Sequence, residues 1–172
     1  GRMSKKIGLL VGSLRKESYS LKIARNLMQI FPKDYALELI EIGNLPFYNE
    51  DLEAEEPAEY KAFRKKINAK DAIVFITPEY NRSVPAVLKN ALDVGSRPYG
   101  KSVWDGKPAL VVSISQGSIS GFGANHHLRQ SLVFLNMYPL QQPEVYLAKV
   151  QAQLDDKGEA VESLNKFFGT VV

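Results

Sequence analysis

The segment AIVFITPEYNRSVPAVLKNALD, residues 72–93, decides the fold of this 172-residue chain. Residues 72–76 form an apolar run that is rich in β-branched side chains and too short for an isolated helix. This run predicts a strand buried on both faces. A polar stretch between Pro78 and Pro85 follows it, and then apolar residues at helical spacing from Val84 to Leu92. Open α/β sheets bind ligands at such strand-to-helix loops, so we expect function here.

The same alternation of strand and helix extends in both directions. We expect strands at 6–11, 36–42, 72–76, 107–115 and 140–145. We expect helices at 21–31, 57–68, 84–92 and 124–137, and a last helix with Val161, Leu164, Phe168 and Val171 on one face. This order predicts an α/β fold with a parallel sheet between helices and right-handed crossovers. Five strands fit the flavodoxin-like order 2-1-3-4-5.

The chain is long enough for one well-filled core and short for two, so we predict a single domain over 3–172. Gly1 and Arg2, ahead of Met3, are expected to be a cloning remnant. No apolar run is long enough to cross a bilayer and no signal-peptide core is visible, so we expect a cytoplasmic protein without a membrane partner. The net charge of +3 is not concentrated in a long basic run. The densest cluster, 64–66, favours a solvated helix face over nucleic-acid binding.

The composition also limits the chemistry. The chain has no cysteine, which excludes disulfides, thiolate nucleophiles and thiolate metal sites. Its only histidines, His126 and His127, are neighbours in a predicted helix and therefore point in different directions, which makes them a poor metal pair. We expect no metal, and any redox chemistry must come from a bound cofactor.

Three loops with unusual sequences, 12–20, 77–84 and 115–123, are expected to meet at one edge of the sheet. The first offers the hydroxyls of Ser13, Ser18 and Ser20, the guanidinium of Arg15 and backbone N–H groups at a helix start, which together suit a phosphate. The alternative is that Ser20 only caps the helix. Neither G-x-x-x-x-G-K-[ST] nor G-x-G-x-x-G is present, so a terminal monophosphate bound without metal fits best.

The second loop lies between two prolines and could present rigid backbone groups to the edge of a flat heterocycle, with Tyr80 as an apolar surface. The alternative is a simple strand-to-helix turn in which Ser83 helps to start the helix. The third loop has glycines at 117, 121 and 123, which allow close approach of the backbone to a planar ligand.

Together these motifs resemble the NADPH-dependent FMN reductase family, and most closely its bacterial chromate and quinone reductase branch. The resemblance extends over about 7–144. It depends on 12–15 with Ser18 and Ser20, on 78–81 leading to 88–93, on Ser115 with Gly117 and Gly121, and on 127–130.

The resemblance implies bound FMN, with cofactor-binding residues in all three loops. Its phosphate would lie on the first loop and its ring along the second and third, on a site formed by Ser13, Leu14, Arg15, Ser18, Ser20, Pro78, Glu79, Tyr80, Asn81, Arg82, Ser115 and Gly117. The family often has glycine, arginine and tryptophan where this chain has Ser120, Gly123 and Val94. These departures concern the nicotinamide contacts and the acceptor more than the phosphate.

The resemblance also implies an enzyme in which FMN takes a hydride from NADPH or NADH and passes it to quinones, chromate, azo compounds or free flavin. No side chain need be catalytic. Family members form dimers or tetramers, and Glu144 matches a position near such an interface. One alternative is a flavodoxin-like electron carrier that does not oxidise NAD(P)H, although such carriers are usually strongly acidic and this chain is mildly basic. Another is a non-flavin domain that binds a small phosphorylated ligand.

Overall fold

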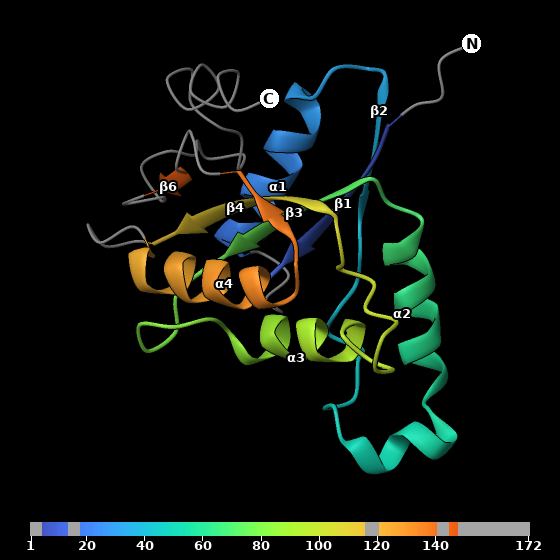
Figure 1. Ribbon diagram of the computed structural model, residues 1–172. Helices are drawn as coiled ribbons and strands as arrows, with labels where there is room; N and C mark the ends of the chain where they lie inside the picture. The colour runs from blue at the N-terminus through green and yellow to red at the C-terminus, as the bar shows by residue number, and fades with distance from the viewer. Residues whose placement is uncertain (1–4, 14–17, 116–120, 141–144, 148–172) are drawn as a thin grey trace.

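A computed structural model describes residues 5–13, 18–115, 121–140 and 145–147 of the chain (Figure 1). Strands and helices alternate along it. In chain order the elements are β1 (Lys5–Val11), α1 (Tyr19–Ile30), β2 (Tyr35–Leu39), the 3-10 helix η1 (Glu50–Glu55), α2 (Ala58–Asn68), β3 (Ala72–Thr77), α3 (Ala86–Gly95), β4 (Pro108–Ile114), α4 (Phe122–Phe134), β5 (Tyr138–Pro139) and β6 (Val145–Leu147).

All the strand pairs are parallel, and the sheet order is β2-β1-β3-β4-β5. The predicted flavodoxin-like order is therefore confirmed. β5 pairs with the start of β4, at Pro108 and Ala109, and β6 pairs with its end, from Val112 to Ile114. The two short strands thus share the fifth position in the sheet.

Residues of β3 show why helices must cover both faces of this sheet. Ile73 and Phe75 point into one apolar cluster, and Val74 and Ile76 into another, because side chains alternate along a strand. All four are at most 3% exposed. Helix α1 covers one face, while α2, α3 and α4 cover the other (Figure 1).

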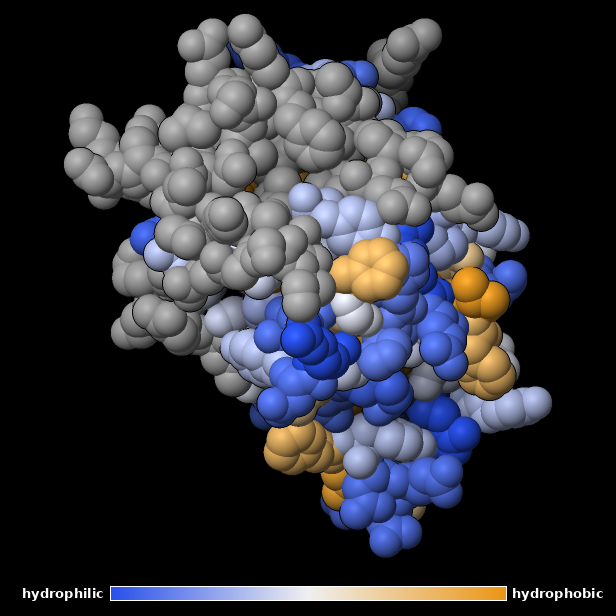
Figure 2. Space-filling model, turned by 90° about the vertical axis from the view of Figure 1, so that its left-hand side faces the viewer, coloured by the Kyte–Doolittle hydropathy of each residue, from blue (hydrophilic) through white to orange (hydrophobic). Residues whose placement is uncertain are grey.

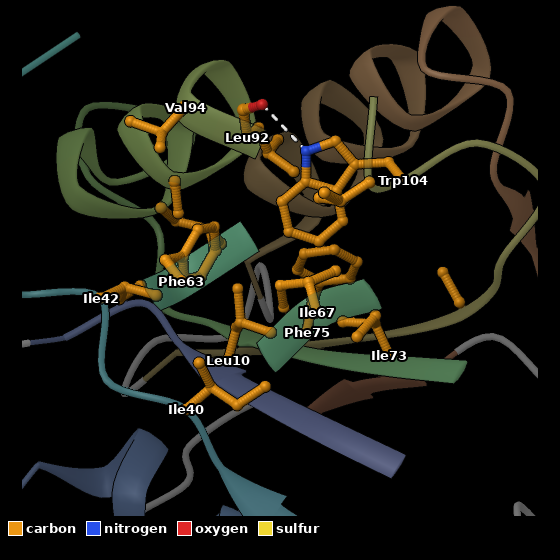
Figure 3. Packing of buried hydrophobic residues seen from close by; sticks show 14 of the residues in the cluster. Leu10, Ile40, Ile42, Phe63, Ile67, Ile73, Phe75, Leu92, Val94 and Trp104 are labelled. Carbon is orange, nitrogen blue, oxygen red and sulfur yellow. Dashed lines mark hydrogen bonds between the residues drawn. The ribbon is translucent and has the colours of Figure 1, made fainter. Parts of the chain in front are cut away.

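Trp104 is the largest side chain of the core on the α2 and α3 side, and it is fully buried (Figure 3). Its indole lies 6.0 Å from the ring of Phe63 and 5.9 Å from that of Phe75. Its Nε1–H donates to the carbonyl of Leu92 at 2.9 Å, so the one polar atom of the ring is satisfied inside the core. The irregular segment between α3 and β4 therefore contributes a core residue.

Several predicted boundaries need correction. The predicted fifth strand, 140–145, is wrong in position because the pairing residues are 138–139 and 145–147. Helix α4 is not 124–137: it runs from Phe122 to Phe134, and the chain turns at Asn136, which has a left-handed φ of 57°. Residues 50–55, for which no element is predicted, form η1. The predicted C-terminal helix lies outside the described residues. None of the described helices has the length and apolar character needed to cross a bilayer.

Candidate functional site

The loops that follow β1 and β3 touch at the carboxyl edge of the sheet. The N–H of Gly12 donates to the carbonyl of Ile76 at 2.8 Å. A Cβ atom at Gly12 would lie 3.2 Å from Oγ1 of Thr77 and 3.3 Å from Cδ of Pro78. Glycine therefore lets the two strand ends come together, as parallel topology at a switch point requires.

A cavity of about 620 Å³ opens beside these two loops. Ser13 of the first loop and Tyr80 of the second both line it, so two predicted site residues that are far apart in sequence share one space. Gly12 lines it next to Ser13. The other lining residues come from the loop after β2 and from the start of α3, and they are Gly43, Asn44, Leu45, Pro46, Phe47, Pro85, Ala86, Val87 and Asn90.

Figure 2 views the molecule from the side toward which β3 and β4 run in Figure 1. On the part of this face not drawn in grey, apolar residues lie in separate small groups among hydrophilic ones.

The loop after β3 forms a tight hairpin. Tyr80 N–H donates to the carbonyl of Ser83 at 3.0 Å, and Ser83 N–H donates to the carbonyl of Tyr80 at 2.9 Å. Between them Asn81 and Arg82 have φ values of 51° and 65°. Two successive left-handed residues make a type I′ turn, whose backbone is well defined. The hairpin presents Tyr80 with half of its surface exposed.

Helix α4 holds this hairpin from the other side. The Glu79 carboxylate accepts a hydrogen bond from the N–H of Ala124 at 3.0 Å, at the positive end of the helix. The Ser83 hydroxyl lies 2.8 Å from Nδ1 of His127. The interpretation in which Ser83 starts α3 is therefore wrong: Pro85 precedes that helix and no side chain caps it.

The glycine at 123 has a physical reason in this arrangement. A Cβ atom there would clash with the carbonyl oxygen of Arg82. The hairpin and the start of α4 can therefore pack this closely only when residue 123 lacks a side chain.

The start of α1 is suited to an anion. Its first turn has no acidic side chain, and the cap is Ser18, whose Oγ accepts from the N–H of Leu21 at 3.1 Å. The interpretation of Ser20 as the cap is wrong, because Ser20 is the second residue of α1 and is only 1% exposed. The N–H groups of a helix start carry a positive partial charge and bind phosphates.

The opposite wall of the cavity, 43–48, is one that the sequence reasoning missed. Asn90 on α3 pins it: its Oδ1 accepts from the N–H of Tyr48 at 2.8 Å, and its Nδ2 donates to the carbonyls of Leu45 at 3.3 Å and Pro46 at 3.2 Å. From α2, the Tyr60 hydroxyl lies 2.8 Å from the carbonyl oxygen of Pro46 and 2.9 Å from that of Phe47.

An ion pair supports the far end of the same segment. Glu53 accepts from the Arg97 guanidinium and from the Tyr48 hydroxyl, which lowers the pKa of Glu53 to about 2. Burial, followed by the hydrogen bond to Glu53, raises the pKa of Tyr48 to about 12. Near neutral pH Glu53 is therefore ionised and Tyr48 is protonated, so both bonds that hold this end of the segment are present. One signal in the sequence could have indicated this wall. Residues 43–48 follow the predicted strand 36–42, and ligands bind at the carboxyl ends of the strands in open α/β sheets.

The remaining predicted residues are distributed as follows. Pro78 is half-buried at the end of β3, and Ser115 directly follows β4. Asn81 and Arg82 form the exposed tip of the hairpin. Leu14, Arg15, Gly117, Ser120 and Glu144 lie outside the described residues. Val94 is fully buried in the core and does not reach the site.

The described residues fit FMN better than a metal. The start of α1 suits its phosphate. Ser13 and Tyr80 line one cavity, and a cavity of this size has room for a ligand with an anionic end and a flat end. Within the described ranges no group of His, Asp and Glu is arranged to hold a metal ion. His126 and His127 point apart, as predicted, toward Tyr146 and Ser83.

Comparison with known proteins agrees with this geometry. A family model described as NADPH-dependent FMN reductase matches residues 5–152. A quinone reductase of Pseudomonas putida is 55% identical over 167 residues, covering 96% of this chain and 90% of its own length. A 2-hydroxy-1,4-benzoquinone reductase of a Burkholderia species is 40% identical, with coverages of 98% and 92%. The solved structure of FerB, a flavoenzyme NAD(P)H:(acceptor) oxidoreductase from Paracoccus denitrificans, superposes with a TM-score of 0.91 at 36% identity, covering 97% of this chain and 92% of FerB.

Proposed function

The chain belongs to the NADPH-dependent FMN reductase family, and from that premise we propose how this molecule works and on what it acts. It is an oxidoreductase that uses FMN and NAD(P)H. Its acceptors are quinones, in keeping with the names of its relatives in Pseudomonas putida and Burkholderia. The observation that carries the proposal is that Ser13 and Tyr80 line one cavity, and that the loop containing Ser13 leads to a helix start that suits a phosphate.

The first loop holds the anionic end of the cofactor. Ser13, Leu14, Arg15, Ser18 and Ser20 would hold the FMN phosphate together with the backbone N–H groups at the start of α1, whose first turn has no acidic side chain. A guanidinium and a helix start bind a dianion through charge-assisted hydrogen bonds, so no metal is needed.

The second and third loops hold the flat end. The hairpin at 80–83 is fixed by its own two backbone hydrogen bonds and by the bond that Ala124 N–H of α4 donates to Glu79, so its groups are ready to meet the ring without reordering. Pro78, Glu79, Tyr80, Asn81 and Arg82 of the second loop and Ser115 and Gly117 of the third would hold the ring.

Bound FMN supplies the redox chemistry, taking a hydride from the nicotinamide and delivering it to the acceptor. The side chains therefore bind and orient, and none acts as acid or base. The protein works as a homo-oligomer, dimer or tetramer, in the cytoplasm. Chromate, azo compounds and free flavin are further acceptors.

The test is an absorption spectrum of the purified protein before and after addition of FMN, followed by NADPH or NADH with and without a quinone. We expect a yellow complex that is bleached by the nicotinamide and regains its colour when the quinone is added. A complex that binds FMN but ignores both nicotinamides would favour an electron carrier. A protein that stays colourless in excess FMN would refute the proposal.

A charge substitution tests the phosphate site directly. Arg15→Ala removes one charge-assisted contact and should weaken FMN binding by about 1.5 to 3 kcal/mol. Arg25→Ala is the matched control, because Arg25 is an exposed arginine on α1 and should leave the affinity unchanged. Equal FMN affinities of the two variants would remove Arg15 from the site.

A further inference from the structure

The cavity beside Tyr80 has a wall that none of the predicted cofactor residues explains. We propose that the part of the cavity between 43–47 and the start of α3 is the subsite for the apolar body of the electron acceptor, with Phe47 and Ala86 as its specificity-determining residues. This inference rests on the proposed function, because it assigns a place to the acceptor of that reaction.

The lining of this subsite suits an uncharged aromatic molecule. Six of its residues are apolar and belong to two facing segments, Leu45, Pro46 and Phe47 on one side and Pro85, Ala86 and Val87 on the other. Among the described residues that line the cavity there is no lysine, arginine, aspartate or glutamate. Binding sites for small organic molecules have this character, whereas an oxyanion needs a charged or N–H-rich partner.

The wall is rigid, although Phe47 itself is 77% exposed. Asn90 fixes the backbone at 45, 46 and 48, and Tyr60 binds the carbonyls of Pro46 and Phe47. An exposed aromatic side chain on an immobilised backbone loses little entropy when a ligand packs on it. Buried polar residues thus serve here to hold an apolar surface in place.

The location also agrees with electron transfer from the proposed flavin site. Tyr80 belongs both to the hairpin proposed to line the flavin ring and to the lining of this cavity. An acceptor whose apolar body lies against Phe47 can therefore reach past Tyr80 toward the ring. We infer that the enzyme favours quinones with apolar ring substituents over small anionic acceptors.

Two substitutions and one control test the subsite. Phe47→Ala removes an aromatic wall, and Ala86→Trp fills the space from an exposed position in the first turn of α3. Tyr99→Ala is the matched control, because Tyr99 is an 89% exposed aromatic residue that does not line the cavity.

For each FMN-loaded protein we would measure kcat/KM for 2-methyl-1,4-naphthoquinone and for ferricyanide. Calorimetry without any nicotinamide would give the Kd of the quinone, and fluorescence titration of the apoprotein the Kd of FMN.

The ratio of kcat/KM for the quinone to that for ferricyanide should fall about ten-fold in Phe47→Ala and Ala86→Trp, because a hydrophobic contact in a specificity pocket changes discrimination by about this factor or more. The Kd of the quinone should rise by a similar factor, and Tyr99→Ala should change neither quantity.

Two results would overturn the inference. One is an unchanged ratio together with an unchanged quinone Kd in both variants. The other is a loss of FMN affinity as large as the loss in quinone preference, which would make the wall at 43–47 part of the flavin site and not of an acceptor subsite. If the unaltered protein oxidised no nicotinamide with any acceptor, the proposed function would fail, and the calorimetric comparison of the variants would still decide the subsite.

Discussion

Two loops line the same cavity with an exposed aromatic residue each, and they are held in place in opposite ways. Tyr80 lies in a hairpin closed by its own backbone hydrogen bonds, four residues from end to end. Phe47 lies in a segment with few bonds of its own, pinned by Asn90 and Tyr60 from α3 and α2.

The difference shows which loops of a binding site can be predicted from their own residues and which depend on residues far away in the sequence. A turn closed by its own backbone can be inferred from the residues in it, since two prolines and an Asn-containing tip favour it directly. A segment held by a side chain more than forty residues away cannot, because the sequence of the segment does not contain its support. The following predictions separate the two cases.

The largest effect should come from Asn90→Ala. The variant leaves the N–H of Tyr48 and the carbonyl of Leu45 without their Asn90 partner, whereas the carbonyl of Pro46 keeps the Tyr60 hydroxyl. Polar groups left unsatisfied away from water are costly. We expect a loss of about 3 kcal/mol in the free energy of unfolding, measured by urea denaturation. Lys89→Ala, at an exposed position next to it, should change stability by less than about 0.5 kcal/mol. A loss below about 1 kcal/mol in Asn90→Ala would show that the 43–48 segment holds itself.

A smaller effect is expected from Glu79→Ala in the other loop. The substitution removes the hydrogen bond to Ala124 N–H and a negative charge at the start of α4, while the hairpin keeps its two backbone bonds. We expect a loss of about 1 kcal/mol in thermal or urea unfolding. Glu41→Ala, at an exposed carboxylate, serves as the control. A loss as large as that of Asn90→Ala would contradict the claim that the hairpin supports itself.

Acid should weaken the 43–57 segment selectively. The pKa of Glu53 is about 2 in the folded protein, below its ordinary value of 4.5, because Arg97 and Tyr48 bind the carboxylate. The contribution of the ionised Glu53 carboxylate to the free energy of unfolding is therefore complete above about pH 4.5. It is lost as the pH falls from 4.5 toward 2. In Glu53→Gln the urea midpoint should fall less steeply over this range than in the unaltered protein. Glu55→Gln, exposed in the same 3-10 helix, should follow the unaltered protein. Parallel curves for Glu53→Gln and the unaltered protein would disprove the assignment.

The smallest effect concerns the tip of the hairpin. Arg82 has a left-handed φ of 65°. This backbone conformation has a higher free energy in a residue with a side chain than in glycine. Arg82→Gly should therefore stabilise the protein by about 0.5 kcal/mol, after allowance for the greater freedom of glycine in the unfolded chain. Ser96→Gly, at a residue with a right-handed φ of −74°, should destabilise and serves as the control. Destabilisation in both variants would mean that the ion pair between Arg82 and Glu79 outweighs the backbone strain.

The apolar runs and their order were sufficient to predict the sheet. Residues 72–76 are apolar at every position, and β3 is buried on both faces as this pattern requires. The short fifth position was misplaced because its pairing residues, 138–139 and 145–147, form no single apolar run. One interpretation assigned the cap of α1 to Ser20, because two serines separated by one residue look equivalent in sequence. The cap is Ser18.

The sequence by itself determined the strand order, the two loops that meet at Gly12 and the family to which the chain belongs, since all of these follow from contiguous residues. Only the tertiary structure decided that a third segment, 43–48, completes the cavity. The physical reason is that Asn90 bonds with residues 42 to 45 positions earlier in the chain, and such bonds exist only once α3 has packed beside that segment.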